Sequence, residues 1–210
     1  MKIKQQPAGD RPVVWHPGQV TGEERSLLLK QRPATLWLTG LSGAGKSTIA
    51  CALERRLIDC GHAAYVLDGD NVRHGLNGDL GFSPKDRAEN IRRIAEVARL
   101  MNDAGILVIT AFISPYIEDR DMARRIISSS AGFLEVHVST PMEICEERDP
   151  KGLYKLARRG EIPGFTGISA PYEPPLAPLC TIDTTRYSVD ECVELLMGLL
   201  DPFLKVSTSK

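Results

Sequence analysis

Short apolar runs alternate with longer amphipathic segments through most of the chain. The apolar runs predict buried strands over 34–39, 63–67, 106–112 and 133–139, with a weaker strand near 180–183. The amphipathic segments predict helices over 47–60, 84–104, 116–130, a stretch after 141, and 188–200. Strands that are apolar throughout and alternate with helices are typical of a sheet covered on both faces. We therefore expect an α/β fold with a mostly parallel five-stranded sheet and helices on both faces.

The two ends and one internal segment depart from this alternation. Residues 1–32 predict an arm rich in Pro, Gly and Gln followed by a short helix capped by Thr21, and 205–210 predict a disordered tail. Between them, 33–204 form the predicted domain. The segment at about 148–178 has early basic residues, then glycines and prolines without an apolar period, and is long for a connection. We expect a mobile lid, with a solvated surface excursion as the alternative.

Composition and charge narrow the class of protein. A content of 42% hydrophobic and 25% charged residues is typical of a globular domain, and 26 basic against 27 acidic residues supply no field that attracts nucleic acid. No apolar run is long enough to cross a bilayer, and the N-terminus lacks a secretory signal, so we expect no membrane segment and a cytoplasmic location. The five cysteines contain no C-x-x-C pair, so we expect reduced, mostly buried thiols.

The strongest motif lies between the first predicted strand and the helix that follows it. The segment from Gly40 to Ser47 fits G-x-x-x-x-G-K-[ST], in the context that this motif requires. Its backbone N–H groups can surround phosphates, Lys46 can reach the β- and γ-phosphates, and Ser47 can ligate Mg²⁺. We assign nucleotide binding to Gly40, Ser42, Gly43, Ala44, Gly45, Lys46, Ser47 and Thr48. Because no N-K-x-D guanine signature is present, the motif favours a small-molecule kinase that uses ATP and Mg²⁺.

Charged side chains follow the second predicted strand. Asp68-Gly-Asp70 comes at its carboxyl end, on the rim of the sheet that carries the glycine loop, although this sequence also suits a tight turn. Asp68 can hold a magnesium-bound water or accept a proton from a hydroxyl group. Arg73 follows, and Arg87 falls in the first turn of a helix, where a cation opposes the helix dipole and suggests contact with an anion. Asn90 shares the face of Arg87, and plain surface arginines are the alternative.

Further short motifs follow the glycine loop in order. They are D-G-D-N-V-R-H-G-L-N at 68–77, R-A-E-N-I-R-R at 87–93, F-I-S-P at 112–115, K-G-L-Y-K-L-A-R at 151–158 and G-F-T-G-I at 164–168. With the glycine loop they resemble the adenylylsulfate kinase family along almost the whole chain. The resemblance implies a P-loop three-layer fold, and transfer of the ATP γ-phosphoryl group to the 3′-hydroxyl of adenosine 5′-phosphosulfate. The product would be 3′-phosphoadenosine 5′-phosphosulfate, made in sulfate assimilation.

The resemblance also implies roles for individual residues. The acceptor contacts it implies are Asp70, Asn71, Arg73, Arg87, Asn90, Ile113, Ser114, Lys151 and Gly164, with Phe82 and Phe165 on either side of the adenine. The physical chemistry agrees, because a planar base needs flat apolar faces and a phosphosulfate needs guanidinium donors. Ordinary core aromatics are the alternative for the two phenylalanines. Arg148 and the segment at Thr184 are the implied places for the ATP adenine.

Ser114 occupies the position that the family commonly assigns to a phosphoserine intermediate. The residues themselves indicate another role, because Ser114 and Pro115 form an N-cap and N1 pair that predicts a helix start, and no histidine or other base lies next to the hydroxyl. We expect mainly substrate contact from Ser114. The catalytic candidates are thus Asp68, Lys46 and Ser114, and the metal candidates are Ser47 and Asp68.

The hypothesis for the chemistry is direct in-line transfer. Asp68 orients or deprotonates the 3′-hydroxyl, and Lys46 with Mg²⁺ on Ser47 stabilises the phosphate oxygens. Three basic residues of the lid close over the phosphate oxygens and exclude water: Lys151, Lys155 and Arg158.

Partners and alternatives follow from the same premises. A second catalytic domain does not fit in 210 residues, so we expect a separate ATP sulfurylase to make the acceptor. The resemblance implies a homodimer, and we expect no nucleic-acid or membrane partner. The runner-up is a P-loop kinase for a nucleoside monophosphate or a sugar acid. A regulatory nucleotide-binding module with slow turnover is the alternative from another class.

Overall fold

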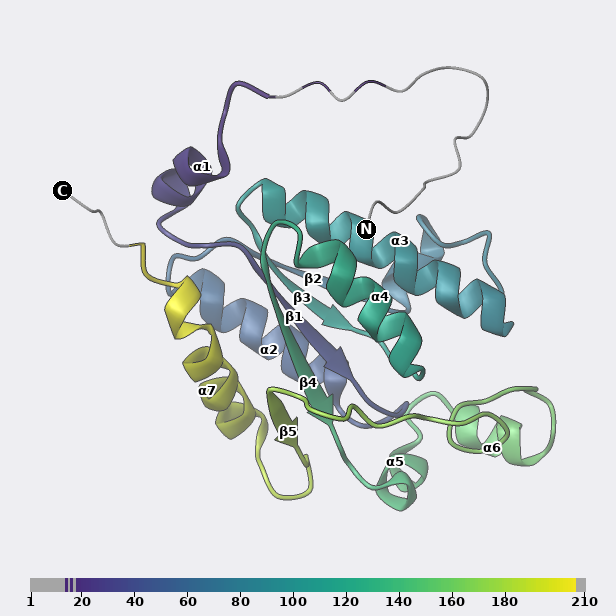
Figure 1. Cartoon of the computed structure of the whole chain (residues 1–210). Coiled ribbons are helices and arrows are strands. Elements are labelled where there is room, and N and C mark those ends of the chain that lie inside the picture. The colour runs from purple at the N-terminus through teal and green to yellow at the C-terminus, as the bar shows by residue number, and fades with distance from the viewer. Residues whose placement is uncertain (1–13, 15, 17, 207–210) are drawn as a thin grey trace.

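The structure is a computed structural model, and it describes residues 14, 16 and 18–206. Its centre is an all-parallel five-stranded sheet in the order β2-β3-β1-β4-β5, which confirms the predicted fold class (Figure 1). The strands are β1 (Ala34–Thr39), β2 (Ala64–Asp68), β3 (Leu107–Ala111), β4 (Gly132–Val138) and β5 (Cys180–Ile182). Leu36 of β1 lies opposite Ile109 of β3 and Leu134 of β4.

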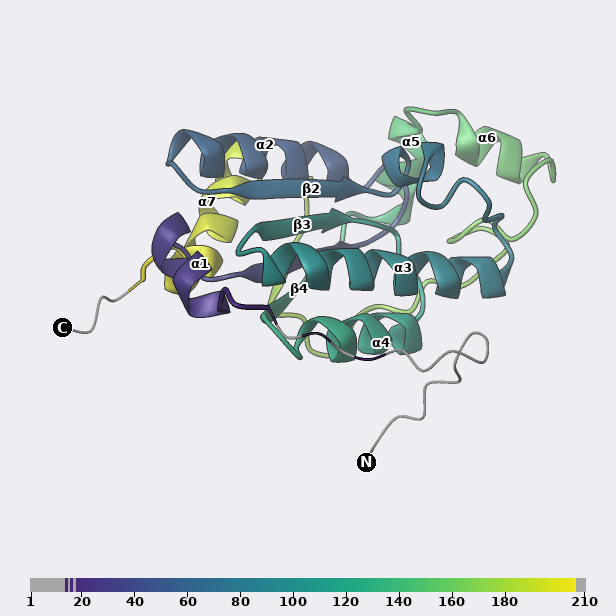
Figure 2. The same cartoon turned by 90° about the horizontal axis from the view of Figure 1, so that it is seen from above.

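Helices cover both faces of this sheet. They are α1 (Gly22–Leu29), α2 (Lys46–Asp59), α3 (Pro84–Asp103), α4 (Ile117–Ile127), α5 (Met142–Arg148), α6 (Leu153–Arg158) and α7 (Val189–Leu200), with 3-10 turns η1 (Asn71–His74) and η2 (Asp201–Phe203). Helices α2 and α7 lie on one face, and α3 and α4 on the other (Figure 2). Helices α5 and α6 lie near the carboxyl ends of the strands, and α1 lies at the opposite end (Figure 1). The carboxyl rim is therefore left to loops, α5 and α6.

The central strand explains why two cores form. All six residues of β1 are buried, and alternate side chains of a strand point to opposite faces. Leu36 and Leu38 join the core beneath α2 and α7, whereas Trp37 joins the core beneath α3 and α4. An apolar run without polar alternation thus corresponds to a strand that is covered on both sides.

Local signals place the helix ends where the sequence predicted them. Thr21 forms a capping box with Glu24, whose backbone N–H donates to Thr21 Oγ1 at 3.1 Å. Ser83 caps α3 with Pro84 in its first turn, and the backbone N–H of Asp86 donates to Ser83 Oγ at 3.2 Å. These caps involve residues that are close in sequence, which is why the pattern of residues alone could identify them.

The predicted helix start at Ser114 and Pro115 is wrong. Helix α4 begins at Ile117, and the backbone N–H of Ile117 donates at 2.8 Å to Glu173 Oε2, a residue far along the chain. Ser114 has φ of 39° and is held by tertiary contacts: Trp37 Nε1 donates to its Oγ at 3.2 Å, and Arg120 Nη1 to its carbonyl at 2.7 Å. The N-cap residue of α4 is Tyr116, so Ser114 lies two residues too early in the chain to cap the helix.

Two further expectations need adjustment. The segment at 148–178 is not wholly irregular, because it contains α6, whose Tyr154 and Ala157 are buried. The cysteines are free, but they are not mostly buried: Cys145 and Cys192 are, whereas Cys51 and Cys60 lie on the exposed side of α2 and at its end. A small thiol has too little apolar area to fix which face of a helix it occupies.

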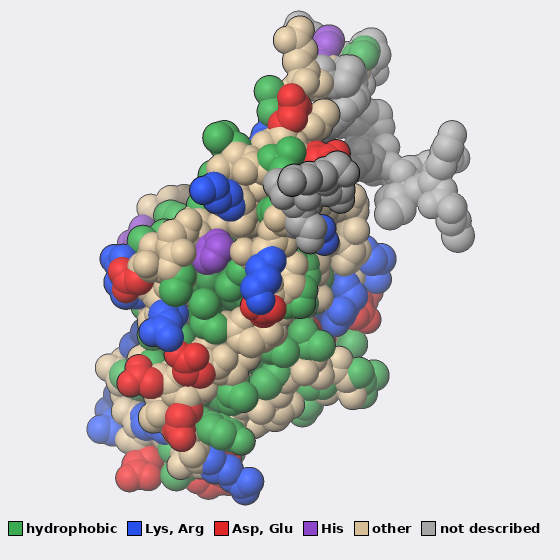
Figure 3. Space-filling view, turned by 90° about the vertical axis from the view of Figure 1, so that its left-hand side faces the viewer, with side chains coloured by type: hydrophobic (Ala, Val, Ile, Leu, Met, Phe, Trp, Pro, Cys, Tyr) green, Lys and Arg blue, Asp and Glu red, His purple; other side chains and the backbone are tan. Residues whose placement is uncertain are grey.

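Surface and termini complete the description. In the part of the chain that is described, no helix has the length and apolar character needed to cross a bilayer. The face drawn in Figure 3 has acidic and basic side chains interspersed with hydrophobic ones, in line with the net charge of −1. Most of the predicted arm, including Trp15, and tail residues 207–210 lie outside the described residues.

Candidate active site

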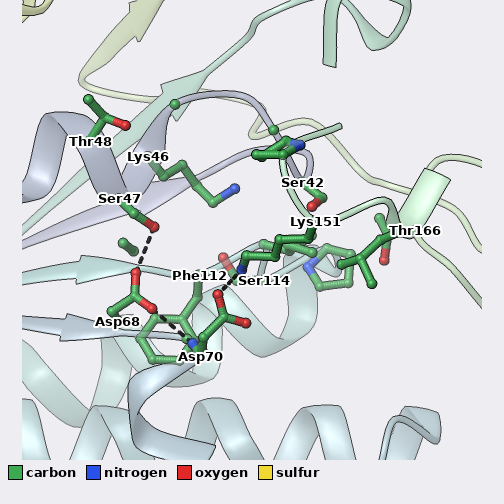
Figure 4. A pocket seen from close by; sticks show the side chains of 18 of the residues that line it. Ser42, Lys46, Ser47, Thr48, Asp68, Asp70, Phe112, Ser114, Lys151 and Thr166 are labelled. Atoms are coloured by element: carbon green, nitrogen blue, oxygen red, sulfur yellow. Dashed lines mark hydrogen bonds and ion pairs between the residues drawn. The ribbon is translucent and has the colours of Figure 1, made fainter. Parts of the chain in front are cut away.

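A cavity of about 1110 Å³ opens at the carboxyl rim of the sheet (Figure 4). Its wall combines the glycine loop, the segment after β2, the start of α3, the loop after β3 and parts of the 148–178 segment. Ligands of open α/β sheets bind at this rim, because the loops that follow parallel strands meet there. The sequence motifs, which are scattered over more than a hundred residues, thus come together around one space.

The glycine loop depends on its glycines for shape. Gly43 and Gly45 have φ of 76° and 102°, which favours glycine over any residue with a side chain. A Cβ on Gly43 would lie 2.7 Å from the Cys145 carbonyl oxygen, so the loop also packs too tightly for one. Gly40 and Ala44 do not line the cavity; Ala44 is fully buried and its carbonyl accepts from Thr140 Oγ1 at 3.0 Å. These two residues shape the loop from behind.

Lys46 is a buried cation at the inner end of this loop. It is 7% exposed, and its Nζ donates to the carbonyl oxygens of Gly40 at 2.8 Å and Leu41 at 2.6 Å. Burial lowers the pKa of Lys46 to about 8, because the charged form loses water that two neutral carbonyls only partly replace. A phosphate in the cavity would supply the missing negative charge.

Ser47 and Asp68 form a hydrogen-bonded pair that lines the cavity. Ser47 Oγ donates to Asp68 Oδ2 at 2.6 Å, and Asp68 Oδ1 accepts from the Asp70 backbone N–H at 2.9 Å (Figure 4). Hydroxyl and carboxylate oxygens are the ligands that Mg²⁺ prefers. Among the described residues, no group of three or more His, Cys, Asp or Glu could hold a metal ion. The donor set therefore fits Mg²⁺ held partly by protein and completed by phosphate oxygens and water.

Arg73 and Phe82 together form another part of the cavity wall. Arg73 Nη1 donates to the carbonyls of Leu80 at 3.0 Å and Gly81 at 3.2 Å, and its guanidinium lies 4.3 Å from the Phe82 ring centroid. Phe82 is 65% exposed, so it is not an ordinary core aromatic. An exposed ring that is held by a cation offers a flat face to a planar ligand.

Arg87 joins α3 to the 148–178 segment. Its Nε donates to the Phe82 carbonyl at 3.0 Å, Nη1 to Thr166 Oγ1 at 2.6 Å, and Nη2 to the Gly164 carbonyl at 2.5 Å. All three nitrogens thus have protein partners. They connect the Phe82 carbonyl to Gly164 and Thr166, the residues on either side of Phe165, which is the other predicted aromatic contact. Phe165 is buried and packs edge-on against Tyr154, with ring centroids 5.0 Å apart. Arg87 therefore ties the backbone beside one ring to the segment that carries the other, and it also lines the cavity. Phe165 belongs to the core beneath α2 and α7, as expected of a core aromatic, and it lines the cavity as well.

Residues from the end of α5 onward also line the cavity next to the glycine loop. Arg148 Nη1 donates to Thr184 Oγ1 at 2.7 Å, which brings together the two residues expected near the ATP adenine. Lys151 forms an ion pair with Asp70, and both side chains are more than half exposed (Figure 4). The pair spans the cavity from the 148–178 segment to the segment after β2.

Some predicted residues lie away from the cavity. Asn71 and Gly164 do not line it, although Gly164 contributes its carbonyl to Arg87. Lys155 and Arg158 do not line it either, and Arg158 pairs instead with Glu146 at 2.8 Å. Apart from Gly40 and Ala44, the remaining predicted residues do line it, including Asn90, Ile113 and Ser114. Ser114 is only 2% exposed and its Oγ accepts the Trp37 indole N–H, a setting that holds the hydroxyl in place.

Several lining residues carried no signal that sequence reasoning could use. Phe112 and Thr166 lie within the quoted motifs but were given no role. Tyr187 comes from the turn before α7, and Val189 and Cys192 come from its first turn. These three residues are apolar or aromatic, as many core residues are, and nothing in their spacing indicates a cavity. Only the packing of α7 beside the glycine loop places them there.

Comparisons with known proteins agree on one family. A protein-family model described as "Adenylylsulphate kinase" matches residues 32–183. An adenylyl-sulfate kinase of Clostridium acetobutylicum is 53% identical over 188 residues, which cover 90% of this chain and 93% of that protein. One from Shewanella sp. (strain MR-7) is 56% identical over 198 residues, covering 94% and 96%. The solved structure of the Mycobacterium tuberculosis APS kinase CysC in complex with AMPPNP and APS has a TM-score of 0.79 and 50% identity, and covers 81% of this chain and 99% of that one.

Proposed function

The chain belongs to the adenylylsulfate kinase family, and we propose that it transfers the γ-phosphoryl group of ATP to the 3′-hydroxyl of adenosine 5′-phosphosulfate. The observation that carries this proposal is that two sets of residues line one cavity. One set is the glycine loop with Lys46, and the other is Phe82 and Phe165 with Arg73 and Arg87. A site for a nucleoside triphosphate and a site suited to a second, anionic nucleotide thus share one cavity.

The chain's own residues account for positioning of the phosphates. The backbone N–H groups of the glycine loop and the start of α2 surround the β- and γ-phosphates, and Lys46 neutralises their charge. Ser47 and Asp68 would hold Mg²⁺, which supplies charge neutralisation at the β- and γ-oxygens when bound. Arg148, Thr184 and Tyr187 border the space next to the glycine loop, where the ATP adenine would lie.

Asp68 is the candidate for the proton transfer. It lies at the end of β2 and lines the cavity, so its carboxylate can accept the 3′-hydroxyl proton as the hydroxyl oxygen bonds to the γ-phosphorus and ADP leaves. Ser114 lines the cavity as a contact residue, because its hydroxyl is held by Trp37. Lys151 closes the cavity from the 148–178 segment and helps to exclude water.

The wider setting is part of the same proposal. A separate ATP sulfurylase supplies the phosphosulfate, the protein acts as a homodimer in the cytoplasm, and neither nucleic acid nor a membrane is a partner. The near-neutral net charge supports the absence of a nucleic-acid partner.

The deciding experiment measures ADP release from Mg-ATP by the purified protein. Adenosine 5′-phosphosulfate, AMP, a sugar acid and no acceptor are compared side by side. We expect stimulation by the phosphosulfate alone. Equal stimulation by AMP or the sugar acid would contradict the acceptor assignment, and ADP release that no acceptor changes would point to a regulatory nucleotide-binding module.

A further inference from the structure

Asn77 is a fully buried polar residue in the loop between η1 and α3. Its backbone N–H donates to the Val72 carbonyl at 2.9 Å, and its carbonyl accepts from the Leu80 N–H at 3.2 Å. These backbone hydrogen bonds do not satisfy the side-chain amide, and burying an amide costs free energy unless it has a hydrogen-bond partner of its own. A specific partner for this amide is therefore expected.

That partner is Asn90, in the second turn of α3. Asn77 Nδ2 donates to Asn90 Oδ1 at 2.9 Å, between two buried residues. The other polar atom of the side chain, Asn77 Oδ1, is buried without a hydrogen-bond partner. The Asn77 amide thus makes one directed contact, and that contact uses the oxygen of Asn90.

This contact decides which end of Asn90 faces the cavity. Asn90 lines the cavity three residues after Arg87, and its Oδ1 is already engaged by Asn77. Its Nδ2 makes no hydrogen bond with any residue in the described ranges, so the amide N–H groups are the end that remains for a ligand. N–H donors suit the oxygens of a phosphosulfate or a ribose, whereas a rotated amide would present an oxygen that repels an anion.

We propose that Asn77 is a positioning residue for the acceptor, which it serves by holding the Asn90 amide with its N–H groups toward the cavity. Asn77 itself does not line the cavity, so its effect on a ligand must pass through Asn90. The inference rests on the proposed function and extends it, because it names a residue that touches no ligand and yet sets affinity for one of the two substrates.

The test is a double-mutant cycle of Asn77→Ala, Asn90→Ala and the pair, read by ADP release and by calorimetric binding of adenosine 5′-phosphosulfate. Loss of one hydrogen bond to a charged ligand lowers affinity by about tenfold, so we expect Asn77→Ala to raise the KM and Kd for the acceptor by about that factor. The KM for ATP should change by less than about twofold. In the Asn90→Ala background, Asn77→Ala should add no further loss.

A matched control separates positioning from stability. Asn102, at the other end of α3, is equally buried and its Nδ2 donates to the carbonyls of Ala34 at 3.1 Å and Ile106 at 3.0 Å, but it does not line the cavity. Asn102→Ala should lower Tm and leave both KM values unchanged. If Asn77→Ala does not fold, Asn77→Ser takes its place in the cycle.

The outcomes are distinct. A wild-type acceptor Kd in the Asn77 variant, or additive losses in the pair, would overturn the inference. Wild-type protein that binds the phosphosulfate without ADP release would overturn the proposed function, while the binding cycle still decides the role of Asn77. Wild-type protein that does not bind the phosphosulfate would overturn both.

Discussion

Individual residues of the cavity hold charges that the protein alone does not neutralise. Lys46 is the clearest case, because its ammonium group is buried against two carbonyl oxygens. Its pKa of about 8 means that a substantial fraction of the free protein has a neutral Lys46 in mildly alkaline solution. The residue is therefore placed to respond to a phosphate.

Nucleotide binding should accordingly take up protons. Phosphate charge favours protonated Lys46 and raises its pKa, so near pH 8, where about half of the free protein is deprotonated, binding of Mg-ATP should take up roughly half a proton. At pH 6.5 the residue is already charged and this uptake should vanish. Calorimetry in two buffers of different ionisation enthalpy measures it. Lys46→Arg stays charged throughout, so uptake that persists in this variant would assign it to another group.

Asp68 should matter for turnover more than for nucleotide affinity. Asp68→Asn keeps the shape of the side chain but removes the proton acceptor, so kcat should fall by about 10²–10³-fold while the KM for ATP changes little. Steady-state kinetics at saturating phosphosulfate measures this. Asp59→Asn, on an exposed residue at the end of α2, is the control. Unchanged turnover in Asp68→Asn would remove Asp68 from the chemistry.

Substitution of Arg87 should weaken binding of the acceptor and leave binding of ATP unchanged. Arg87→Ala removes three hydrogen bonds that link Phe82 to the segment around Phe165, so the acceptor KM should rise by about tenfold or more. Arg87→Lys keeps the charge but cannot reach all three acceptors, and it should restore little of the loss. Equal losses for ATP and the acceptor in either variant would contradict the assignment.

At the scale of elements, one buried ion pair joins α4 to the sheet. Arg120 of α4 donates through Nε to Glu135 of β4 at 2.8 Å, and both side chains are less than a tenth exposed. The same guanidinium holds the carbonyls of Ser114 at 2.7 Å and Glu173 at 2.8 Å. A helix, a strand, the loop after β3 and the end of the 148–178 segment therefore depend on one side chain.

Loss of one member of this pair should be costly. Arg120→Met leaves the Glu135 carboxylate buried with only Arg124 beside it, and should lower the free energy of unfolding by about 3–5 kcal/mol. Urea unfolding followed by circular dichroism measures the change. Arg125→Met, on the exposed side of the same helix, should cost less than about 0.5 kcal/mol. Similar losses in the two variants would show that the pair contributes nothing specific.

At the scale of the whole molecule, the cavity lies between the carboxyl rim of the sheet and the segment 148–178. Part of that segment is packed, since the Tyr154 hydroxyl donates to the Ser42 carbonyl at 3.0 Å and Phe165 is buried. Its basic residues Lys155 and Arg158 do not line the cavity. Whether the segment moves remains a prediction, and the Lys151 to Asp70 pair is its direct link across the cavity.

Bound substrates should protect this segment from proteolysis. It carries trypsin sites at Lys151, Lys155, Arg158 and Arg159, all exposed, and closure over ADP and adenosine 5′-phosphosulfate together should slow cleavage there by about tenfold or more. Mass spectrometry of timed digests locates the cuts. Cleavage at Lys30, which is exposed at the end of α1 and lies at the opposite end of the sheet from the cavity, is the internal control. Equal slowing at Lys30 would indicate general stabilisation instead of closure.

Much of the fold followed from residues that are close in sequence. The five strands, the main helices and the caps at Thr21 and Ser83 were predictable, because periodicity and capping act over a few residues. The glycine loop was predictable for the same reason: its phosphate site is built from eight consecutive residues. The ordered motifs identified the family and most of the cavity wall.

Contacts between distant residues were decided only by the tertiary structure. Glu173 caps α4 from 56 residues away, Trp37 holds the Ser114 hydroxyl from 77, and Arg87 reaches Thr166 from 79. The Ser114 helix start failed, and the apolar wall from α7 went unseen, because neither has a local signature. Sequence determined which chemistry this chain carries, since motifs are local. Packing decided which partner each polar side chain has and which end of a side chain such as Asn90 faces the cavity, because packing brings together residues that no short-range pattern relates.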